Sequence, residues 1–217
     1  MSQQKKGTGR DIARMEGFSD GVFATAITLP IFSVEMPDLG ADGGDLLRAL
    51  ASDWPSYAAY LLSFFVIGVY WLRHHFAGKI YVQADHGFNL VNLMFLMTVC
   101  FVPFPIRVLL EYLGDPTRRD VASIFFLAAL LLPAITWTIK WFYAARTGTI
   151  DHRLDPAYVR GLTRRYVATV AAYAAALLLV FLDHRLGLLL GLAVTLLYLW
   201  PPPPPVFASS TEDRDAS

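Results

Sequence analysis

The sequence predicts an all-α integral membrane protein, and three observations carry that prediction. Hydrophobic residues make up 55% of the 217-residue chain and charged residues only 17%, whereas a soluble domain has about 25% charged residues. The mean hydropathy is +0.45. Apolar runs of the length that crosses a bilayer recur along the chain, and the charged residues gather between them. The lipid bilayer is therefore the expected surrounding of most of the chain.

Six transmembrane helices are expected from runs of roughly 20 apolar residues. The sixth is about 22 Å long at 1.5 Å per residue, which is short for a hydrocarbon core of about 30 Å. It needs length from neighbouring residues or a locally thinned bilayer. The run WPPPPP ends it, because proline has no amide hydrogen. The predicted helices cover about 12–36, 54–76, 88–113, 121–142, 159–182 and 186–200.

Residues 1–200 are predicted to form one six-helix transmembrane domain, followed by a Pro-rich end and a disordered tail over 201–217. Basic residues gather before the first span and in the loops after the second and fourth spans, whereas acids match or outnumber bases in the other loops. By the positive-inside rule, both termini and the tail should be cytoplasmic. We expect a multi-pass protein of the cell (inner) membrane, with nothing removed from its amino terminus.

Charge and cysteine content exclude several functions. The 18 basic and 18 acidic side chains cancel, so net charge gives no support for a nucleic-acid partner. Cys100 is the only cysteine, which rules out an intrachain disulfide. His74 and His75 could join Asp85 and His86 around a metal, but no spacing such as H-E-x-x-H is present. We predict no metal and no cofactor.

The first span, GFSDGVFATAITLPIFSVEM, carries many polar groups for a membrane helix. At 100° per residue, Thr25, Thr28, Leu29 and Phe32 fall within about 100° of one face, and Asp20 points about 140° away. Hydroxyls alternating with bulky apolar side chains could line a narrow conduit with hydrophobic constrictions. They could equally be ordinary packing, with the threonines bonded to carbonyls one turn earlier. The residues alone leave both interpretations open.

Glu35 lies at the outer end of the same span, beside the stripe. With Asp38 and Asp42 it could concentrate cations at a pore mouth. A solvated carboxylate with no such role is an equal alternative.

The stretch RMEGFSD at Arg14–Asp20, followed by GVFATAITL, resembles the signature of the transmembrane protein 175 family, the potassium-selective channels of lysosomes and many prokaryotes. The signature Arg-x-x-x-Phe-Ser-Asp is matched in full. WLRHHF at 71–76 resembles the end of the family's second helix, and NLMFL at 92–96 with PFP at 103–105 resembles its third. The resemblance covers roughly the first 110 residues.

The resemblance implies the single-repeat, prokaryotic form of the family: a homotetramer of six-helix subunits. First helices would surround a central pathway, with hydrophobic constrictions in place of a carbonyl filter. The permeant species would be potassium, with leakage of other monovalent cations. Thr25 stands where the family usually has isoleucine or leucine, so we expect the narrowest point to shift outward to Leu29 or Phe32 and the selectivity for potassium to weaken. Pro30 replaces a family leucine and can kink the helix.

The resemblance also implies a polar network behind the pore helix that pairs each buried charge. A histidine in it could make gating respond to pH, although a neutral structural histidine is the simpler interpretation. The residues matched to the network are Arg14, Phe18, Ser19, Asp20, Trp71, His74, His75 and Asn92.

Two other functions compete with a channel. A secondary cation or proton transporter could use a proline-broken helix, but paired broken helices in two halves are missing. A membrane hydrolase could use Ser19 and Asp20, but no G-x-S-x-G elbow is present. We therefore predict a channel, with a transporter as the alternative, and no enzyme.

Overall fold

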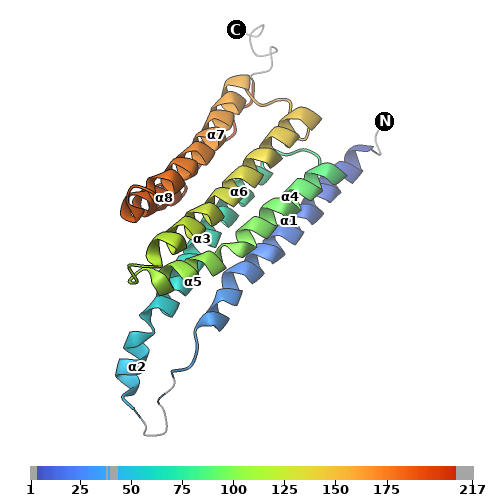
Figure 1. Cartoon of the computed structure of the whole chain (residues 1–217). Coiled ribbons are helices and arrows are strands. Elements are labelled where there is room, and N and C mark those ends of the chain that lie inside the picture. The colour runs from blue at the N-terminus through green and yellow to red at the C-terminus, as the bar shows by residue number, and fades with distance from the viewer. Residues whose placement is uncertain (1–3, 38, 40–43, 209–217) are drawn as a thin grey trace.

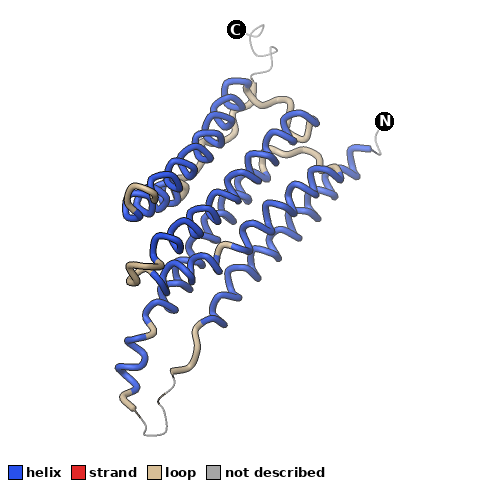
Figure 2. Tube along the Cα trace, in the orientation of Figure 1, coloured by secondary structure: helices blue, strands red, loops and turns tan. Residues whose placement is uncertain are grey.

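The computed structural model describes residues 4–37, 39 and 44–208, and helices make up most of that part of the chain (Figure 2). The long helices lie side by side as a bundle, and α2 projects beyond it at the end opposite the start of α1 (Figure 1). The elements are α1 (Gln4–Thr28), the 3₁₀ helix η1 (Leu29–Ser33), α2 (Leu46–Ser52), α3 (Trp54–Gly78), α4 (His86–Phe101), α5 (Pro103–Tyr112), α6 (Arg119–Thr147), α7 (Pro156–Leu179) and α8 (His184–Leu197).

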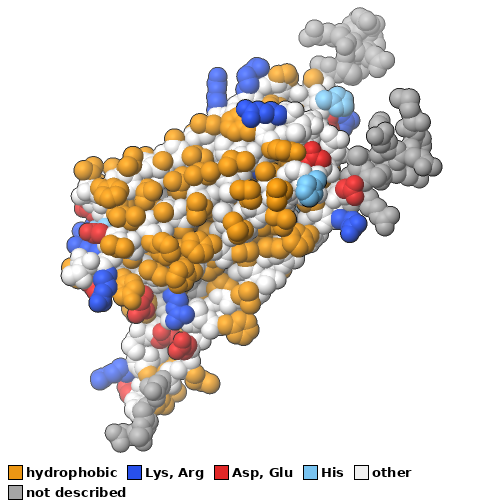
Figure 3. All heavy atoms as spheres, turned by 45° about the vertical axis from the view of Figure 1, so that its right-hand side comes forward, with side chains coloured by type: hydrophobic (Ala, Val, Ile, Leu, Met, Phe, Trp, Pro, Cys, Tyr) orange, Lys and Arg blue, Asp and Glu red, His pale blue; other side chains and the backbone are white. Residues whose placement is uncertain are grey.

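Three stretches are long and apolar enough to cross a membrane by length and composition: Trp54–Gly78, His86–Tyr112 and Arg119–Thr147. The shorter helix α8 is also apolar. Hydrophobic side chains cover the middle of the face shown in Figure 3, and most charged side chains lie toward its two ends. The predicted all-α, membrane-spanning class is confirmed.

Prolines divide two of the helices that the sequence predicts as continuous. Helix α1 ends at Thr28, and a 3₁₀ turn with Pro30 near its start continues to Ser33. The predicted 88–113 helix is split into α4 and α5 at Val102, directly before Pro103. Proline cannot donate to the carbonyl one turn earlier, so the helical ladder is interrupted at both places. The interruption at Pro30 agrees with the kink expected there, whereas the break before Pro103 was not predicted from the sequence.

Helix α2 was not predicted from the sequence. Asp45 caps its start, because its carboxylate accepts hydrogen bonds from the Leu47 and Arg48 amides at 3.0 and 3.4 Å. At the other end of the bundle, α6 runs to Thr147 and is closed by Gly148 with a φ of 72°, a conformation that suits glycine. The sixth predicted helix ends three residues early, at Leu197.

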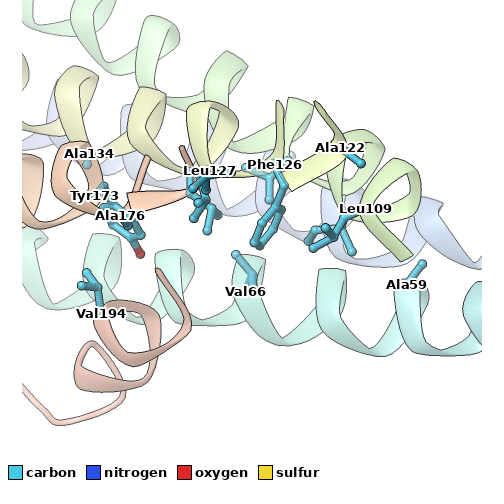
Figure 4. Packing of buried hydrophobic residues seen from close by; sticks show 14 residues of the cluster. Ala59, Val66, Leu109, Ala122, Phe126, Leu127, Ala134, Tyr173, Ala176 and Val194 are labelled. Carbon is cyan, nitrogen blue, oxygen red and sulfur yellow. The ribbon is translucent and has the colours of Figure 1, made fainter. Parts of the chain in front are cut away.

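The largest core cluster joins α3, α5, α6, α7 and α8 (Figure 4). Phe126 and Leu127 of α6 contribute large buried side chains to it, and Val66 of α3 and Tyr173 of α7 face the same interior. A separate cluster fixes α1: Phe23 and Ala26 pack against side chains of α3 and α4. One side of α1 is thus part of the packed interior.

Up to Ala208, the Pro-rich end packs against the rest of the protein. The Asp155 amide donates to the Val206 carbonyl at 2.8 Å, and the Tyr158 hydroxyl donates to the Pro203 carbonyl at 3.1 Å. In the same loop, hydrogen bonds from Arg153 hold the pKa of Asp151 at about 2, so this carboxylate stays ionised and keeps the loop closed at neutral pH. The tail predicted to be disordered lies outside the described residues beyond Ala208.

The contact between α7 and α8 depends on Gly187. A Cβ added there would lie 2.4 Å from Val180 Cγ2 and 2.7 Å from the Ala176 carbonyl oxygen. Backbone atoms cannot move away cheaply, so we predict that Gly187→Ala lowers the free energy of unfolding by about 1–3 kcal/mol. Thermal unfolding in detergent, followed by tryptophan fluorescence, measures the effect.

Gly161→Ala in α7 is the matched control, because a Cβ there would meet nothing within 4 Å. It should leave stability unchanged or raise it by up to about 1 kcal/mol through helix propensity. Equal melting curves for the two variants would contradict the close α7–α8 contact.

Candidate functional site

The predicted stripe on the first helix faces away from the packed interior of the single chain. Leu29 is 54% exposed and Phe32 80% exposed, although both are large and apolar. Thr25 and Thr28 are also exposed. A membrane protein leaves such a mixed face open to lipid, to another subunit or to a water-filled path.

The threonine hydroxyls on this stripe bond to their own helix. Thr25 Oγ1 donates to the Gly21 carbonyl at 2.9 Å, and Thr28 Oγ1 lies 3.0 Å from the Ala24 carbonyl. The back-bonded arrangement considered from the sequence is therefore present. Because the proton points at the helix, the oxygen lone pairs remain free on the exposed side. Such a hydroxyl can accept a hydrogen bond or coordinate a cation.

An open groove of about 610 Å³ runs between α1 and the α4–α5 break, and the stripe residues Thr25 and Leu29 are part of its wall. Gly17 and Gly21 form part of its α1 wall, and Pro103 and Phe104 of α5 form part of the other. A Cβ at either glycine would meet nothing within 4 Å in this chain. Packing inside one subunit therefore does not require these glycines.

On the buried side, polar groups from four helices form one hydrogen-bonded chain. Ser19 of α1 is fully buried, and its hydroxyl donates to the Met15 carbonyl at 2.9 Å and accepts from Asn92 Nδ2 at 2.9 Å. Asn92 Oδ1 of α4 accepts from Lys140 Nζ of α6 at 2.7 Å. His74 Nε2 of α3 lies 3.1 Å from Asn92 Oδ1 and 3.3 Å from Lys140 Nζ. The predicted network residues Ser19, His74 and Asn92 thus meet.

Lys140 is 1% exposed, and within the described part of the chain no carboxylate lies within ion-pair distance of it. Four aromatic rings surround its ammonium instead, with centroids 5.1–5.9 Å from Nζ. Cation–π contacts of this kind are worth about 2 kcal/mol each when desolvated. The rings belong to Tyr81, Phe88, Phe95 and Trp137.

His74 Nε2 faces both Lys140 Nζ and Asn92 Oδ1, so its role depends on the tautomer of the ring. With a proton on Nε2 it donates to Asn92 Oδ1, and without one it accepts from Lys140 Nζ. His74 is enclosed further by Phe23, whose ring centroid lies 5.5 Å away, and by Phe95 at 6.2 Å. In either tautomer, His74 is part of the buried polar network.

The remaining predicted network residues lie elsewhere. Asp20 accepts a hydrogen bond from Trp71 Nε1 at 2.9 Å, and Trp71 stacks on His75 with centroids 5.8 Å apart. Arg14 is exposed and forms no ion pair with Asp20 in the described part of the chain. Phe18 is 54% exposed and lines the open groove. The structure therefore separates the buried hydrogen-bonded chain from a second, more exposed group on α1 and α3.

At the outer end, Glu35 is exposed and lies 3.9 Å from Arg107, a surface pair worth at most about 1 kcal/mol. Asp38 and Asp42, its predicted companions, lie outside the described residues. Asp85, which the metal alternative used, caps α4 by accepting from the Phe88 amide at 2.6 Å. No group of three potential metal-ligating side chains occurs among the residues that the structure describes.

Sequence reasoning missed Lys140 because it counted this residue among the basic residues that flank a span. A signal was present: Pro133, Thr136, Lys140 and Ala144 recur at helical spacing, and all four are buried on one face of α6. A lysine in register with an apolar face indicates burial. What it would bond to cannot be read from the spacing.

A helical bundle of this kind has solved relatives. The crystal structure of a lysosomal potassium-selective channel TMEM175 homolog from Chamaesiphon minutus matches with a TM-score of 0.74 and 34% identity, over 88% of this chain and 97% of that one. The family model described as endosomal/lysosomal potassium channel TMEM175 matches residues 14–103. These similarities define an ion channel of the membrane and not an enzyme.

Curated relatives agree with that class. A potassium channel of Streptomyces collinus is 37% identical over 176 residues, which are 81% of this chain and 85% of the relative. The human endosomal/lysosomal proton channel TMEM175 is 30% identical over 183 residues, covering 77% of this chain and 35% of that protein. The chain belongs to the TMEM175 family, as the Arg14–Asp20 motif predicts.

The buried hydrogen-bonded chain can be tested by a double-mutant cycle between Lys140 and Asn92. Asn92→Leu leaves a buried ammonium without its nearest acceptor, and we expect it to lower the free energy of unfolding by about 3 kcal/mol. Lys140→Met should also destabilise. The double variant should cost at least about 1 kcal/mol less than the sum of the two, because no charge is left unsatisfied. Melting curves in detergent measure all four proteins, and strict additivity would show that the two side chains do not interact.

Proposed function

We propose that this chain forms a homotetrameric channel that conducts potassium, and less strictly other monovalent cations, through a path lined by α1 and η1. The observation that carries the proposal is the exposed stripe of Thr25, Thr28, Leu29 and Phe32 on a helix whose opposite side is packed. The bacterial relatives bear the name potassium channel, which supports potassium as the main permeant ion. No cofactor enters the proposal.

Hydrophobic constrictions, rather than backbone carbonyls, would set the selectivity. All four stripe residues lie in helical backbone, α-helical or 3₁₀, whose carbonyls are largely used in hydrogen bonding. Leu29 and Phe32 are the bulky members, so rings of these side chains would narrow the path and force an ion to shed water. Thr25 would add a ring of hydroxyl oxygens one turn earlier. Glu35 at the outer end would raise the local cation concentration.

In the proposed topology the chain crosses the cell (inner) membrane six times, with both termini in the cytoplasm. The beginning of α1 and the residues after α8 pack at the same end of the bundle, since Met15 and Leu154 share a core cluster and Leu154 pairs with Phe207. An even number of crossings gives this arrangement. Exposed bases at that end include Lys79, Arg146, Arg160 and Arg164, which the positive-inside rule assigns to the cytoplasm.

Assembly is supported by the two glycines of the α1 groove. Glycine in a helix interior costs about 1 kcal/mol relative to alanine, and no contact within this chain explains Gly17 or Gly21. Small residues four apart allow membrane helices to approach closely. We infer that a neighbouring subunit packs against the part of the groove at Gly17 and Gly21, which brings copies of α1 together around an axis and leaves Thr25 and Leu29 facing that axis.

Proton conduction is the second candidate, because the animal relatives bear the name proton channel. A secondary cation or proton transporter remains the other alternative. Reconstituted liposomes distinguish them: a potassium gradient with a voltage dye reports potassium current, and an internal pH dye without potassium reports proton current. A channel conducts its ion when only the gradient of that ion is present. A transporter also requires the second ion or substrate to which transport is coupled.

The ion pathway can be tested at two neighbouring stripe positions. Thr25→Ile replaces hydroxyls by apolar groups, so it should lower the conductance and raise the potassium-over-sodium permeability ratio about twofold, a shift of about 18 mV in bi-ionic reversal potential. Leu29→Ala should widen the apolar ring and lower that ratio. Planar-bilayer recordings measure both. Leu61→Ala on α3 is the control, because Leu61 is exposed on another face. If all three variants have the same permeability ratio, the stripe does not line the path.

Assembly can be tested by cysteine cross-linking in a Cys100→Ser background. A cysteine at Leu29 should join subunits on oxidation, and native mass analysis should give four copies. Gly21→Leu should abolish the cross-link by filling the groove, whereas Gly68→Leu on α3, where a Cβ also meets nothing within 4 Å, should retain it. Efficient cross-linking from Leu189 on α8 but none from Leu29 would contradict an α1-lined axis.

A further inference from the structure

A second cavity lies away from the α1 stripe, in the interior between α3, α6, α7 and α8. Its enclosed part has a volume of about 60 Å³, and its walls are largely apolar or aromatic. Five tyrosines line it: Tyr70, Tyr158, Tyr166, Tyr173 and Tyr198. Among the described residues that line it, the charged ones are Arg73 and Arg165, so the cavity contains positive charge and no carboxylate.

Both arginines lie near the same aromatic ring, that of Tyr198. The guanidinium carbon of Arg73 lies 4.6 Å from the Tyr198 ring centroid, and that of Arg165 lies 5.8 Å from it. Neither forms an ion pair in the described part of the chain. Two cations near one ring in a poorly hydrated site repel each other, and an anion bound in the cavity would offset that repulsion.

The site lies beneath the end of a helix that is too short for the membrane. Helix α8 has 14 residues, about 21 Å at 1.5 Å per residue, against a hydrocarbon core of about 30 Å. The amides of Tyr198, Leu199 and Trp200 donate to the last carbonyls of α8, so the carbonyls that still need donors near membrane depth belong to the turn after the helix. Arg73 supplies donors there: Nε donates to the Tyr198 carbonyl at 2.9 Å and Nη2 to the Trp200 carbonyl at 2.6 Å.

Unused donors remain after this cap. A guanidinium has five N–H groups, and Arg73 uses two of them on the carbonyls. Among the described residues, none accepts a hydrogen bond from Arg165. Arg165 lies nine residues into α7, about 13 Å from its start at Pro156, and Arg73 lies about 8 Å before the end of α3. This depth is near the boundary between lipid head groups and acyl chains.

We propose that the cavity is the binding site of one anionic phospholipid per subunit, whose phosphate is held by Arg73 and Arg165 below the end of α8. The enclosed volume accommodates only part of one acyl chain, so the tails stay mainly in the bilayer. Because α8 is short, the leaflet has to thin beside it, and a lipid drawn inward brings its phosphate to the level of the arginines. Basic pockets between transmembrane helices recognise anionic head groups in this way. The proposal requires only that the chain spans a membrane, and it is independent of which ion is conducted.

Native mass spectrometry of the detergent-purified full chain tests this proposal, with 1-palmitoyl-2-oleoyl phosphatidylglycerol and its phosphatidylcholine counterpart titrated separately. The wild-type protein should retain one phosphatidylglycerol per subunit and far less phosphatidylcholine. Arg165→Gln should weaken that binding about fivefold to tenfold, the effect of one charge-assisted contact. Arg165→Lys should fall between the two. Arg73 is left intact because its cap on α8 would confuse stability with binding.

Arg164→Gln is the matched control, since it removes the same charge from the neighbouring exposed position outside the cavity. It should bind phosphatidylglycerol like the wild-type protein. Equal weakening by the two variants would overturn the proposal in favour of general electrostatic attraction, and equal retention of both lipids would overturn recognition of charge. Displacement of the lipid by millimolar inorganic phosphate would show a site for a free anion and also overturn it.

Discussion

The burial of one ammonium group, that of Lys140, constrains the half of the bundle around it. A charge at this depth cannot rely on water, so every group near it has to be an acceptor or an electron-rich ring. Asn92 supplies the acceptor, and rings from α4, α6 and the segment after α3 supply the rest. The positions of three elements are thereby tied to one atom, and none of them can move without exposing the charge.

The same chain of bonds reaches α1, the helix whose opposite face is proposed to conduct ions. Asn92 donates to Ser19, and Ser19 donates to a carbonyl of its own helix. One side of α1 is therefore fixed by hydrogen bonds and by Phe23, while its other side stays open. A helix held in this way can present a mixed stripe at a constant angle. The division into a fixed side and an open side follows from the order of small, polar and bulky residues around α1.

Backbone polar groups impose a second constraint, because lipid offers them no partners. The chain breaks its helices at Pro30 and Pro103 and shortens the last one, and side chains bond exposed carbonyls at the first and the last of these places. Ser33 donates to the Pro30 carbonyl at 2.7 Å, and Arg73 caps the end of α8. From the sequence, Arg73 was counted only among the basic residues that set the membrane topology. In the structure it also bonds the backbone after the shortened helix α8, and its charge makes the neighbouring cavity cationic.

Much of this protein was determined by its sequence alone. Apolar length and charge placement gave the helical membrane class and the approximate helices, since those depend on local composition, and the motif ending in Ser19 and Asp20 identified the family. Pro30 indicated a kink in the first helix, but the break at Pro103 was not predicted, because the apolar run continues across it. What only the tertiary structure decided was which distant side chains meet: Lys140 with Asn92, Asp20 with Trp71 rather than with Arg14, and both Arg73 and Arg165 with Tyr198. Periodicity specifies which face of a helix a residue occupies, whereas the partner across that face depends on how separate helices pack in three dimensions.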